Sequence, residues 1–591
     1  MRRCAVSSPN TATWPRGARR PTWRRCPPNG DTCVTSTDRD SAASFDAAVV
    51  VAGGSARRLG RDKPEVVVGG RRLLDAAIAA AGGAAVVVVG PSRAVPERVI
   101  AVREEPPGGG PLAAIAAGLA AVPAEARTVA VMAADLPEVE PSDLARIAAL
   151  RSATGAPVAL AEDHHGHAQY LLSVWDVAAL RAAVADAAAG GPVHAIVPTD
   201  APRLRLPLAD VDTPEDLARA EASPLAVRRL LRAALPALPA AGGPPVPGSV
   251  LAEPLAAAAS FPPFDQSAMD GWAVAGPPPW RPVHGAARAG HAAPALAART
   301  AMRIATGARL PAGADRVIRD EEISRDGTFL TCIDPLRNDV RPTGSAWAPG
   351  AVLAAAGTAV DPALVSLATA AGVSAVAARG PVRIRLHSSG DEVGATGGAG
   401  LPETAWGPVA ATFGAAGCAV VRGPHLPDAP ASFRAALLPD GADVVAIIGA
   451  TGRGAADLLR GALAGAGATL LVDGVDVRPG GSLLVATVPD GPVVVGLGGN
   501  PMAAMLGAAL LAQPLRAALV REAPRTAELL PLAHASPDDR WRMLPVEPDG
   551  LGRWGLPSTV ATPHLRDAVG RRAIALVPPL ARPGDLAERL A

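Results

Sequence analysis

Short runs of Val, Ile and Ala alternate with Ala- and Leu-rich helical stretches in two separate parts of this 591-residue chain. Continuous apolar runs of this length are typical of strands buried on both faces, as in parallel sheets. In the first part, from Phe45 to about residue 220, the expected elements are the strands Ala47–Ala52, Ala85–Val89 and Thr128–Met132 and the helices Asp75–Ala81 and Leu112–Ala121. This alternation restricts the fold to layered α/β domains.

A second α/β pattern begins at Pro381, after a less regular stretch. Its expected elements are the strands Val382–His387, Ala419–Arg422, Val444–Ile448 and Val493–Leu497 and the helices Pro402–Ala416, Ala455–Ala464 and Pro501–Leu515. The Pro/Gly-rich segment Ala240–Ser249 marks a linker, and residues 250–380 are expected to form short strands broken by Pro and Gly. The last 75 residues lack helical periodicity except at Pro583–Leu590, so we expect a small β domain there.

Charge and hydropathy exclude several classes of function. With 56 basic and 55 acidic residues the net charge is +1, which argues against nucleic acid or an acidic membrane as the main partner. The longest apolar run, Ala76–Val89, is too short to span a bilayer, and the five Cys show no disulfide framework, so we expect a cytoplasmic protein. Residues 1–42 have no periodicity and are expected to be disordered or a non-native extension.

One Gly-rich, basic loop contains the only lysine of the chain, Lys63. The strand that ends at Ala52 runs into GGSARRLGRDKP (53–64), and glycines let backbone N–H groups approach a phosphate. The spacing fits neither the P-loop nor the dinucleotide-binding fingerprint. Asp135 follows the strand Thr128–Met132, at the edge where open α/β sheets bind ligands, and a carboxylate there can hold Mg²⁺ against phosphates. Together these features predict a nucleotide site.

The segments AGGSARRLGRDKP (52–64), GGGPLAAIAAGL (108–119), AADLP (133–137), HAQYLLSVW (167–175) and DVDTPEDLARA (210–220) resemble the molybdenum cofactor guanylyltransferase group of nucleotidyltransferases. The resemblance implies a Rossmann-like domain that transfers GMP from GTP, with Mg²⁺, to the molybdopterin cofactor. It implies a pterin pocket near Gln169, phosphate contact at Lys63 and Mg²⁺ at Asp135. The nucleotide-binding residues that it implies are Ala52, Gly53, Gly54, Lys63, Glu105 and Asp135, with Glu105 in place of the acid that precedes the family's GPLAG-like segment.

Three Gly-rich loops follow predicted strands of the second pattern: SSGDE (388–392), GATGRG (449–454) and GGNP (498–501). Loops after successive parallel strands converge on one edge of a sheet, and the predicted helix N-termini that follow two of them favour anions. A site for a phosphorylated ligand, with Asp391 and Glu392 beside it, follows from this arrangement. Upstream, Asp270 and Thr306 lie in the turn-forming segments FPPFDQSAMDGWAV (261–274) and IATGARLPAGADRVIRDEE (304–322).

In combination, PFDQSAMDGWAV, ATGARLPAGAD, SSGDEV and GLGGNPMAA resemble the molybdopterin molybdenumtransferases, which insert molybdate into adenylylated molybdopterin. The resemblance implies a homodimer that acts on small molecules and contacts molybdoenzymes or their chaperones. It places Asp270, Thr306, Asp391 and Glu392 near a metal-insertion cleft, Asp270 and Asp391 as catalytic groups. It places Ser389, Gly390, Asn500 and Pro501 at the pterin-binding edge.

The two resemblances together imply a bifunctional transferase of six parts after residue 42. The expected parts are a nucleotidyltransferase domain (43–222), a first linker region (223–265), a β-rich lobe (266–340), a returning linker region (341–380), a pterin-binding α/β domain (381–516) and a C-terminal β-barrel (517–591).

Two differences from these families leave alternatives open. Where the molybdenumtransferases have a TSGGVSxGxxD loop followed by Lys, this chain reads GATGRGAAD (449–457), so Arg453 is the candidate replacement for the ammonium group. The alternative is a working nucleotidyltransferase joined to a non-catalytic pterin-binding carrier. The first family has an Asn after the second strand, where this chain has Gly90, Pro91 and Ser92, which leaves CTP as the alternative to GTP.

Overall fold

A seven-stranded sheet forms the centre of the N-terminal part in the computed structural model, which describes residues 45–53, 59–187, 191–394, 400–452, 458–557 and 560–591. The strand order is β5-β4-β1-β6-β8-β7-β9. Pairings from β5 to β6 are parallel, and β8 runs antiparallel to both β6 and β7. The strands are β1 (Ala47–Val51), β4 (Ala85–Val89), β5 (Ile100–Val102), β6 (Thr128–Ala133), β7 (Val158–Glu162), β8 (Ala168–Asp176) and β9 (Arg203–Arg205).

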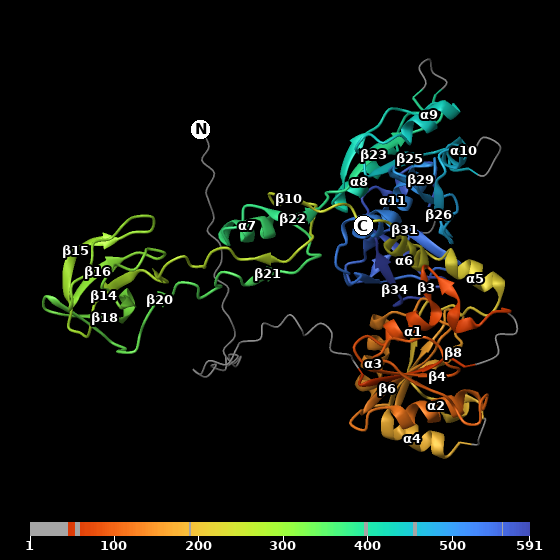
Figure 1. The fold of residues 1–591 in the computed structure, drawn as a ribbon, viewed down its shortest axis with the longest axis horizontal. Helices are drawn as coiled ribbons and strands as arrows, with labels where there is room; N and C mark the ends of the chain where they lie inside the picture. The colour runs from red at the N-terminus through yellow and green to blue at the C-terminus, as the bar shows by residue number, and fades with distance from the viewer. Residues whose placement is uncertain (1–44, 54–58, 188–190, 395–399, 453–457, 558–559) are drawn as a thin grey trace, which may run out of the picture. The chain divides into compact units, whose positions relative to one another are not determined.

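Helices cover both faces of this sheet, as Figure 1 shows. One buried cluster packs α1 (Leu73–Ala80) and α3 (Pro141–Thr154) on one face, and a second packs α2 (Gly110–Ala121) and α4 (Val177–Ala185) on the other. Gly118 lets α2 approach the sheet closely, because a Cβ there would lie 2.5 Å from Cγ1 of Val49. The layered α/β fold predicted from the buried strands is confirmed. The hairpin β2 (Val67–Val68) and β3 (Arg71–Arg72) precedes α1.

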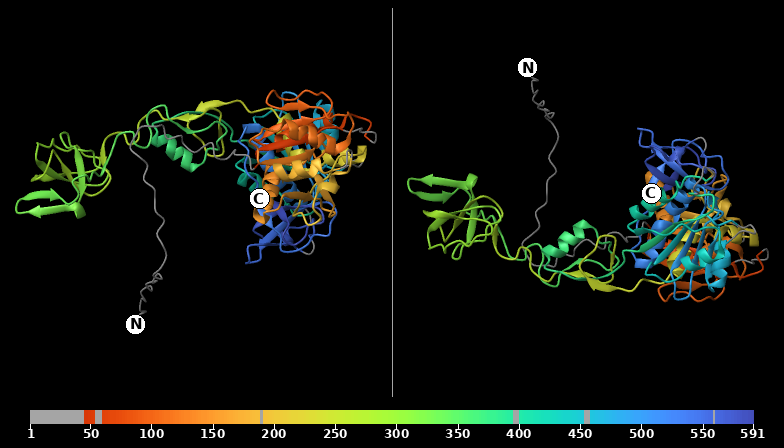
Figure 2. Two further views of the ribbon diagram at one scale, coloured as in Figure 1. Left: turned by 90° about the horizontal axis from the view of Figure 1, so that it is seen from below. Right: turned by 90° about the horizontal axis from the view of Figure 1, so that it is seen from above.

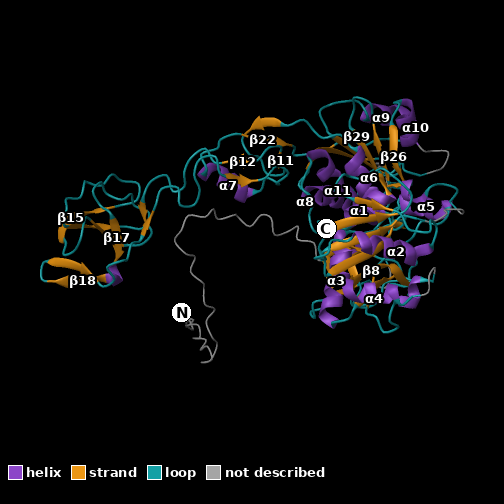
Figure 3. Ribbon diagram, turned by 60° about the horizontal axis from the view of Figure 1, so that its bottom comes forward, coloured by secondary structure: helices purple, strands orange, loops and turns teal. Residues whose placement is uncertain are grey.

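Helices α5 (Pro214–Glu221) and α6 (Pro224–Ala234) lead into a region of short strands. One lobe of this region has a four-stranded sheet of order β15-β16-β14-β17. The lobe is green in Figure 2, and Figure 3 shows its strands in orange and its loops in teal. The chain enters and leaves it through the paired strands β13 and β20. The strands of the lobe are β13 (Gln266–Ser267), β14 (Gly271–Val274), β15 (Arg281–Ala287), β16 (Thr300–Ile304), β17 (Arg316–Arg319), β18 (Ile323–Asp326), β19 (Phe329–Cys332) and β20 (Val340–Arg341).

Two further small sheets and one helix are formed by the segments that precede and follow this lobe in the sequence. They are β10 (Ala241–Gly243), β22 (Val376–Arg379) and β11 (Val250–Leu251) in one sheet, β12 (Leu255–Ala256) and β21 (Val352–Ala354) in the other, and α7 (Pro362–Ala370). Their apolar side chains form a cluster of their own, which includes Leu251, Leu255 and Leu364. Segments on both sides of the lobe in sequence therefore share one small core.

The second α/β sheet has six strands in the order β24-β23-β25-β29-β28-β26, the first four of them parallel. These strands are β23 (Arg383–Ser388), β24 (Ala419–Arg422), β25 (Val444–Ile448), β26 (Thr469–Asp473), β28 (Leu484–Thr487) and β29 (Val493–Leu497). The helices are α8 (Trp406–Ala415), α9 (Pro430–Ala436), α10 (Leu458–Gly465) and α11 (Pro501–Val520). The predicted strands and their alternation with helices are confirmed.

Three predicted elements differ from the structure. The helix expected from Pro402 begins at Trp406, because the Glu403 carboxylate accepts hydrogen bonds from the backbone N–H groups of Ala405 and Trp406. Helix α11 continues past Leu515 to Val520 despite Pro514, since α6 and α8 pack against it. The helix expected from the periodicity at Pro583–Leu590 is wrong, because residues 586–589 form a strand that pairs with two neighbouring strands, residues 529–531 and 573–577.

The last residues, together with β27 from before α11, form an all-β sheet of order β27-β31-β33-β34-β30. Its strands are β27 (Val477–Arg478), β30 (Leu529–Pro531), β31 (Trp541–Pro548), β33 (Ala573–Val577) and β34 (Leu586–Arg589), with β32 (Trp554–Gly555) attached to β31. Among the described residues, α11 is long and apolar enough to cross a membrane, but 83% of its most apolar 18-residue stretch is buried within the protein. Its burial makes it the core helix of the second α/β sheet.

Candidate active sites

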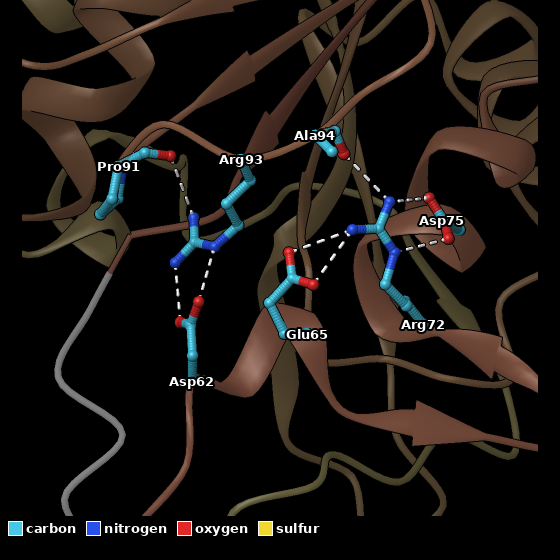
Figure 4. A network of polar contacts seen from close by, with 7 residues as sticks. All are labelled: Asp62, Glu65, Arg72, Asp75, Pro91, Arg93 and Ala94. Atoms are coloured by element: carbon cyan, nitrogen blue, oxygen red, sulfur yellow. Dashed lines mark hydrogen bonds and ion pairs between the residues drawn. The ribbon is translucent and has the colours of Figure 1, made fainter.

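The short segment that carries Lys63 is anchored on both sides (Figure 4). Arg93 forms two hydrogen bonds of 2.8 and 2.9 Å to the Asp62 carboxylate and a third of 2.7 Å to the backbone oxygen of Ala52. On the other side, Arg72 donates to Glu65 at 3.0 and 3.1 Å. The 3₁₀ turn Lys63–Glu65 is therefore fixed relative to the end of β1. The hydrogen bonds from Arg93 lower the pKa of Asp62, so its charge persists.

The Lys63 ammonium group lies between two carboxylates. Its Nζ is 2.9 Å from Oδ2 of Asp135 and 2.5 Å from Oδ1 of Asp212. Burial alone would lower the pKa of Lys63, but the charge of Asp135 and the hydrogen bonds to both carboxylates raise it above its ordinary value. Lys63 is thus a fixed positive charge at neutral pH, and two carboxylates point at one cation position.

The sheet topology explains why these residues meet. After β1, the chain adds β4 and β5 on one side and β6 on the other, so the carboxyl ends of β1 and β6 form a topological switch point. Asp135 follows β6, and the backbone N–H of Val211 donates to the backbone oxygen of Asp135, which places Asp212 there. The capping box of Thr213 and Asp216 starts α5 directly after Asp212 and fixes its backbone.

Of the acids in the Glu104-Glu105 pair, the structure turns Glu104 inward and leaves Glu105 exposed. The Glu104 side chain is buried beside the nucleotide loop, since a Cβ placed on Gly53 would lie 3.7 Å from its Oε1. Oε1 accepts a hydrogen bond of 3.0 Å from the backbone N–H of Gly108, whereas Oε2 has no partner among the described residues. Ala52 is buried at the end of β1, and Gly54 lies outside the described residues. Glu105, the acid that the resemblance implies, is exposed, whereas its neighbour Glu104 is buried.

A cavity of about 270 Å³ opens beside Asp135, between the end of β6 and the start of β8. Gln169 lines it and donates a hydrogen bond of 3.3 Å to Asp163. Because β8 pairs with β6 only as far as Leu172 opposite Met132, residues 169–171 continue past the carboxyl end of β6. The cavity is thus on the opposite side of Asp135 from the end of β1 and from Glu104.

The SSGDE loop after β23 is held by reciprocal contacts with Asp428. The backbone N–H of Asp428 donates to Asp391 at 3.0 Å, and that of Asp391 donates to Asp428 at 3.3 Å. His425 Nε2 contacts the backbone oxygen of Gly390 at 3.0 Å. Gly390 has φ +107°, and a Cβ there would meet the Glu392 carboxylate at 2.5 Å, so the turn requires glycine. Asp391 and Glu392 are both exposed to solvent.

The three Gly-rich loops of the second sheet are neighbours, as predicted. The Ser389 hydroxyl donates to the backbone oxygen of Ile448 at 2.9 Å, and a Cβ on Gly449 would lie 2.6 Å from that hydroxyl. A Cβ on Gly499 would lie 3.7 Å from Cα of Gly449. Asn500 precedes α11, Pro501 is its first residue, and Asn500 donates to the Thr562 hydroxyl at 3.3 Å. Arg453 lies outside the described residues.

Asp270 and Thr306 meet in the β-rich lobe. Oδ1 of Asp270 accepts hydrogen bonds from the backbone N–H of Thr306 at 2.7 Å and from its hydroxyl at 3.0 Å. These bonds, the backbone one first, lower the pKa of Asp270. A Cβ on Gly271 would lie 2.2 Å from the backbone oxygen of Ile318, so the strand after Asp270 must begin with glycine. Asp270 and Thr306 therefore contact each other directly, next to a different sheet from the one that Asp391 follows.

Sequence reasoning missed Asp212, Glu104, Arg93 and Asp428 as site residues. A signal was present for Asp212, which lies in the DVDTPEDLARA segment that carries the first resemblance. The Glu104-Glu105 pair was visible, but which acid turns inward depends on the phase of a three-residue strand. Arg93 and Asp428 act through tertiary contacts across more than 30 residues, for which the sequence has no local signal.

Comparisons with known proteins match three consecutive parts of the chain. Residues 48–244 match the "MobA-like NTP transferase domain", residues 224–372 the "MoeA N-terminal region (domain I and II)" and residues 388–517 the "Probable molybdopterin binding domain".

Individual relatives match about half of the chain or somewhat more. A molybdopterin molybdenumtransferase from Synechococcus elongatus is 30% identical over 318 residues, which cover 48% of this chain and 76% of the relative. Molybdopterin molybdenumtransferase 2 of Mycobacterium tuberculosis is 31% identical over 298 residues, 46% of this chain and 73% of the relative. The crystal structure of the MoeA molybdopterin biosynthesis protein from Pyrococcus horikoshii is 22% identical, with a TM-score of 0.48, and the match covers 61% of this chain and 96% of that protein.

The order of the three family matches agrees with the order of the two α/β sheets along the chain. The chain is therefore a fusion protein, in which a MobA-like NTP transferase domain precedes a member of the molybdopterin molybdenumtransferase family.

Proposed function

We propose that this chain catalyses two consecutive steps of molybdenum cofactor biosynthesis. The second half inserts molybdate into adenylylated molybdopterin and releases AMP, and the first half transfers GMP from GTP to the product. The observation that carries the nucleotidyl transfer is the Lys63 ammonium held between Asp135 and Asp212, at a switch point that has a nucleotide loop on one side and a cavity on the other. Tethering both steps in one chain raises the effective concentration of the shared intermediate.

In the transfer, an oxygen of the acceptor's terminal phosphate forms a bond to the α-phosphorus of GTP. The bond from that phosphorus to the oxygen bridging the α- and β-phosphates breaks, and pyrophosphate leaves with the bond's electron pair. No protein nucleophile is needed, because positioning and charge neutralisation provide most of the catalysis in such transfers. Lys63 provides a fixed positive charge, and Arg93 and Arg72 hold its segment in place.

The donor set around Lys63 fits Mg²⁺. Asp135 and Asp212 supply hard carboxylate oxygens that converge on one cation position, the kind of ligand that Mg²⁺ prefers. When bound, Mg²⁺ would neutralise charge on the triphosphate. Asp135 and Asp212 would hold it, and the Lys63 ammonium would then be free to turn from these carboxylates to the phosphates.

Glu104 favours guanine over cytosine as the base. Its carboxylate is buried, lies beside Gly53 and has one oxygen without a partner among the described residues. The Watson–Crick edge of guanine presents two adjacent N–H donors, which match a carboxylate, and hydrogen bonds to a charged acceptor are strong. Cytosine presents one amino donor beside ring acceptors, which would face the carboxylate unfavourably. GTP is therefore the proposed donor, with Glu104 rather than Glu105 as the base-reading acid.

The second half supports molybdate insertion through Asp391, held by Asp428, and through the convergence of its three loops. A second candidate for this half is a non-catalytic pterin carrier, favoured by the absence of any lysine after Lys63. Molybdate-dependent AMP release would exclude the carrier. We also propose a cytoplasmic homodimer whose product is passed to molybdoenzymes or their chaperones.

The test of the nucleotidyl transfer uses the full chain with GTP, Mg²⁺ and molybdenum-loaded molybdopterin, and measures pyrophosphate release. We expect release in the wild type and in Glu125→Gln, an exposed acid before β6, but at least 100-fold slower release in Asp135→Asn. Equal rates in both variants would contradict the assignment of Asp135. A competition between GTP and CTP tests the base, and a preference for CTP would contradict the role of Glu104.

A further inference from the structure

Helix α6 has two buried faces, and each packs against a different core. On one face, Ala226 belongs to a small apolar cluster with Val68, which lies in the hairpin after the Lys63 turn. On the other face, Val227 and Leu231 belong to the core of the second α/β sheet, where α6 packs against α11. The helix is therefore part of both α/β layers rather than a linker between them.

The segment that carries Lys63 leads into a turn that lies directly against α6. The 3₁₀ turn of Lys63 is followed by the β2–β3 hairpin, which turns at Gly69 and Gly70. A Cβ on Gly69 would lie 2.7 Å from the backbone oxygen of Ala226, and a Cβ on Gly70 would lie 3.2 Å from Cβ of Ala233. Because a helix backbone cannot move aside as a flexible side chain can, the surface of α6 fixes the place of the hairpin and, through it, of the Lys63 turn.

The segment that carries Asp135 reaches the same helix a few residues later. Glu140 accepts a hydrogen bond of 3.3 Å from Nη1 of Arg229, which lies on α6. Glu138 is buried, and the charges of Glu140 and Glu138 both act on the Arg229 guanidinium. Nε and Nη2 of Arg229 are buried and have no hydrogen-bond partner in the part of the chain that the structure describes. Since loss of one partner from a buried charge contact leaves the other charge uncompensated, Arg229 holds the 135–140 segment on α6.

The third charged residue of the site is joined to α6 through α5. Helix α5 begins directly after the capping residue that follows Asp212. At its end, the backbone N–H of Ser223, the N-cap of α6, donates to the backbone oxygen of Ala220 at 3.3 Å. The segments that carry Lys63, Asp135 and Asp212 therefore all end on the same helix.

We infer, on the basis of the proposed nucleotidyl transfer, that α6 positions the charged groups of that site, with Ala226 and Arg229 as the positioning residues. Catalytic groups must be held to within about 0.5 Å of their working geometry, and a single rigid surface under all three segments provides this. Because Leu231 anchors that surface in the second core, the second half of the chain completes the site of the first. The nucleotidyltransferase domain thus includes α6, beyond the boundary expected at residue 222.

Two glycines allow a matched test in the full-length protein. Gly69 has φ +58° and Gly82 has φ +61°, so Ala is similarly strained at both positions. Only at Gly69 does the new Cβ meet α6, since nothing lies within 4 Å of a Cβ on Gly82. We expect Gly69→Ala to lower kcat/KM for GTP in the pyrophosphate assay by about 10- to 100-fold, the scale of a misplacement of about 1 Å. Gly82→Ala should keep the wild-type value, and equal losses in the two variants would overturn the role of α6.

Metal binding tests Arg229 without turnover. Mn²⁺ binding, measured by electron paramagnetic resonance, reports how well Asp135 and Asp212 are placed relative to each other. We expect Arg229→Met to weaken it by about 10- to 100-fold, as is typical when a contact that orients metal ligands is lost, and Arg229→Lys to restore part of the affinity. The matched control is Arg228→Met, on the next residue of α6, which loses an ion pair of 2.6 Å to Glu588 in the last sheet. Wild-type affinity in Arg229→Met, or equal weakening in Arg228→Met, would overturn the inference.

A cavity in the second core tests whether that half supports the first site. Leu231 on α6 and Leu386 on β23 are both fully buried in this core. We expect Leu231→Ala to lower kcat/KM for GTP and Leu386→Ala to leave it unchanged. Equal values for the two variants would overturn the contribution of the second half.

The two kinds of readout separate the role of α6 from the nucleotidyl transfer itself. No pyrophosphate release by the wild type would overturn the transfer, whereas the Mn²⁺ titrations of Arg229→Met and Arg228→Met would still decide whether α6 positions the carboxylates. Release by the wild type, together with equal kcat/KM in the two glycine variants and wild-type Mn²⁺ affinity in Arg229→Met, would overturn the role of α6 while the transfer stood.

Discussion

Replacing Lys63 by Ala removes the one ammonium group that joins Asp135 and Asp212. Removing a single preorganised charge-stabilising group from an active site typically lowers kcat by about 10²- to 10³-fold. The Lys63 side chain is 18% exposed and the two carboxylates 28% and 42%, so solvent screens part of the interaction. We therefore expect the lower end of that range, about a 100-fold loss of kcat for pyrophosphate release.

The same substitution should change stability little. The two ion pairs are partly exposed, and such pairs contribute about 0–1 kcal/mol each. The two pairs together contribute at most about 2 kcal/mol, and 1 kcal/mol corresponds to about 2–4 °C in a domain of this size, so we expect the unfolding midpoint to move by no more than about 8 °C. A loss of activity in Lys63→Ala therefore reports on chemistry rather than on folding, and circular dichroism at the assay temperature checks this.

Metal binding gives the most specific readout for Lys63. Its ammonium group competes with a metal ion for Asp135 and Asp212, so Lys63→Ala should bind Mn²⁺, measured by electron paramagnetic resonance, at least as tightly as the wild type. Asp135→Asn should bind it more weakly. Lys63→Arg serves as the matched control, because it restores a charge in a planar fork that does not reproduce the compact ammonium. Wild-type kcat in Lys63→Ala, or Mn²⁺ binding weakened as much as in Asp135→Asn, would refute this reasoning.

Three further outcomes follow from individual contacts. Glu104→Gln should reduce the ratio of kcat/KM for GTP to kcat/KM for CTP by about tenfold or more, since a matched hydrogen-bonded pair discriminates between bases by about 1–3 kcal/mol. An unchanged ratio would contradict recognition of the base by Glu104. Gly390→Ala should lower molybdate-dependent AMP release, because a φ of +107° is strained for Ala and the new Cβ displaces the Glu392 carboxylate. The control Gly394→Ala has a φ of +74° and no atom within 4 Å of the new Cβ, so it introduces backbone strain alone. Equal rates of AMP release in the two variants would contradict a role for the position of the Glu392 carboxylate. Hydrogen bonds from Arg319, and then from Arg337, lower the pKa of Asp339 from 3.8 to about 2. The contribution of the Asp339 carboxylate to folding stability is therefore present above pH 3.8 and is lost as the pH falls through 2. Asp339→Asn should lower the free energy of unfolding of the β-rich lobe at pH 7 by up to about 2 kcal/mol, as measured by denaturant unfolding.

The predictable part of the fold was the part set by local pattern. Buried Val-rich runs indicated the strands of both α/β sheets, because a strand covered on both faces must be apolar throughout its length. Where a tertiary contact competes with local pattern, sequence reasoning was wrong or incomplete. Helix α11 passes through Pro514 because it is buried against its neighbours, and residues 586–589 form a strand because two partners pair with them.

The same distinction applies to the sites. Lys63 and Asp135 were predicted together because each follows a strand at the same sheet edge, and the structure brings them to 2.9 Å. The inward turn of Glu104 instead of Glu105 is a question of side-chain direction, which composition and spacing do not reveal. Asp212 joins the cluster from 77 residues beyond Asp135 through one backbone hydrogen bond of its neighbour Val211. Such a contact becomes visible only when the sheet is assembled.

The central claim, two consecutive chemical steps in one chain, is tested most directly by a coupled assay. Full-length protein is incubated with adenylylated molybdopterin, molybdate, GTP and Mg²⁺, and AMP, pyrophosphate and the guanylylated product are quantified together. The account predicts that AMP release depends on molybdate and precedes pyrophosphate release, and that the product contains GMP. It also predicts that Asp135→Asn releases AMP normally but releases pyrophosphate at least 100-fold more slowly than the wild type. AMP release that is indifferent to molybdate, or a wild-type product without GMP, would contradict it.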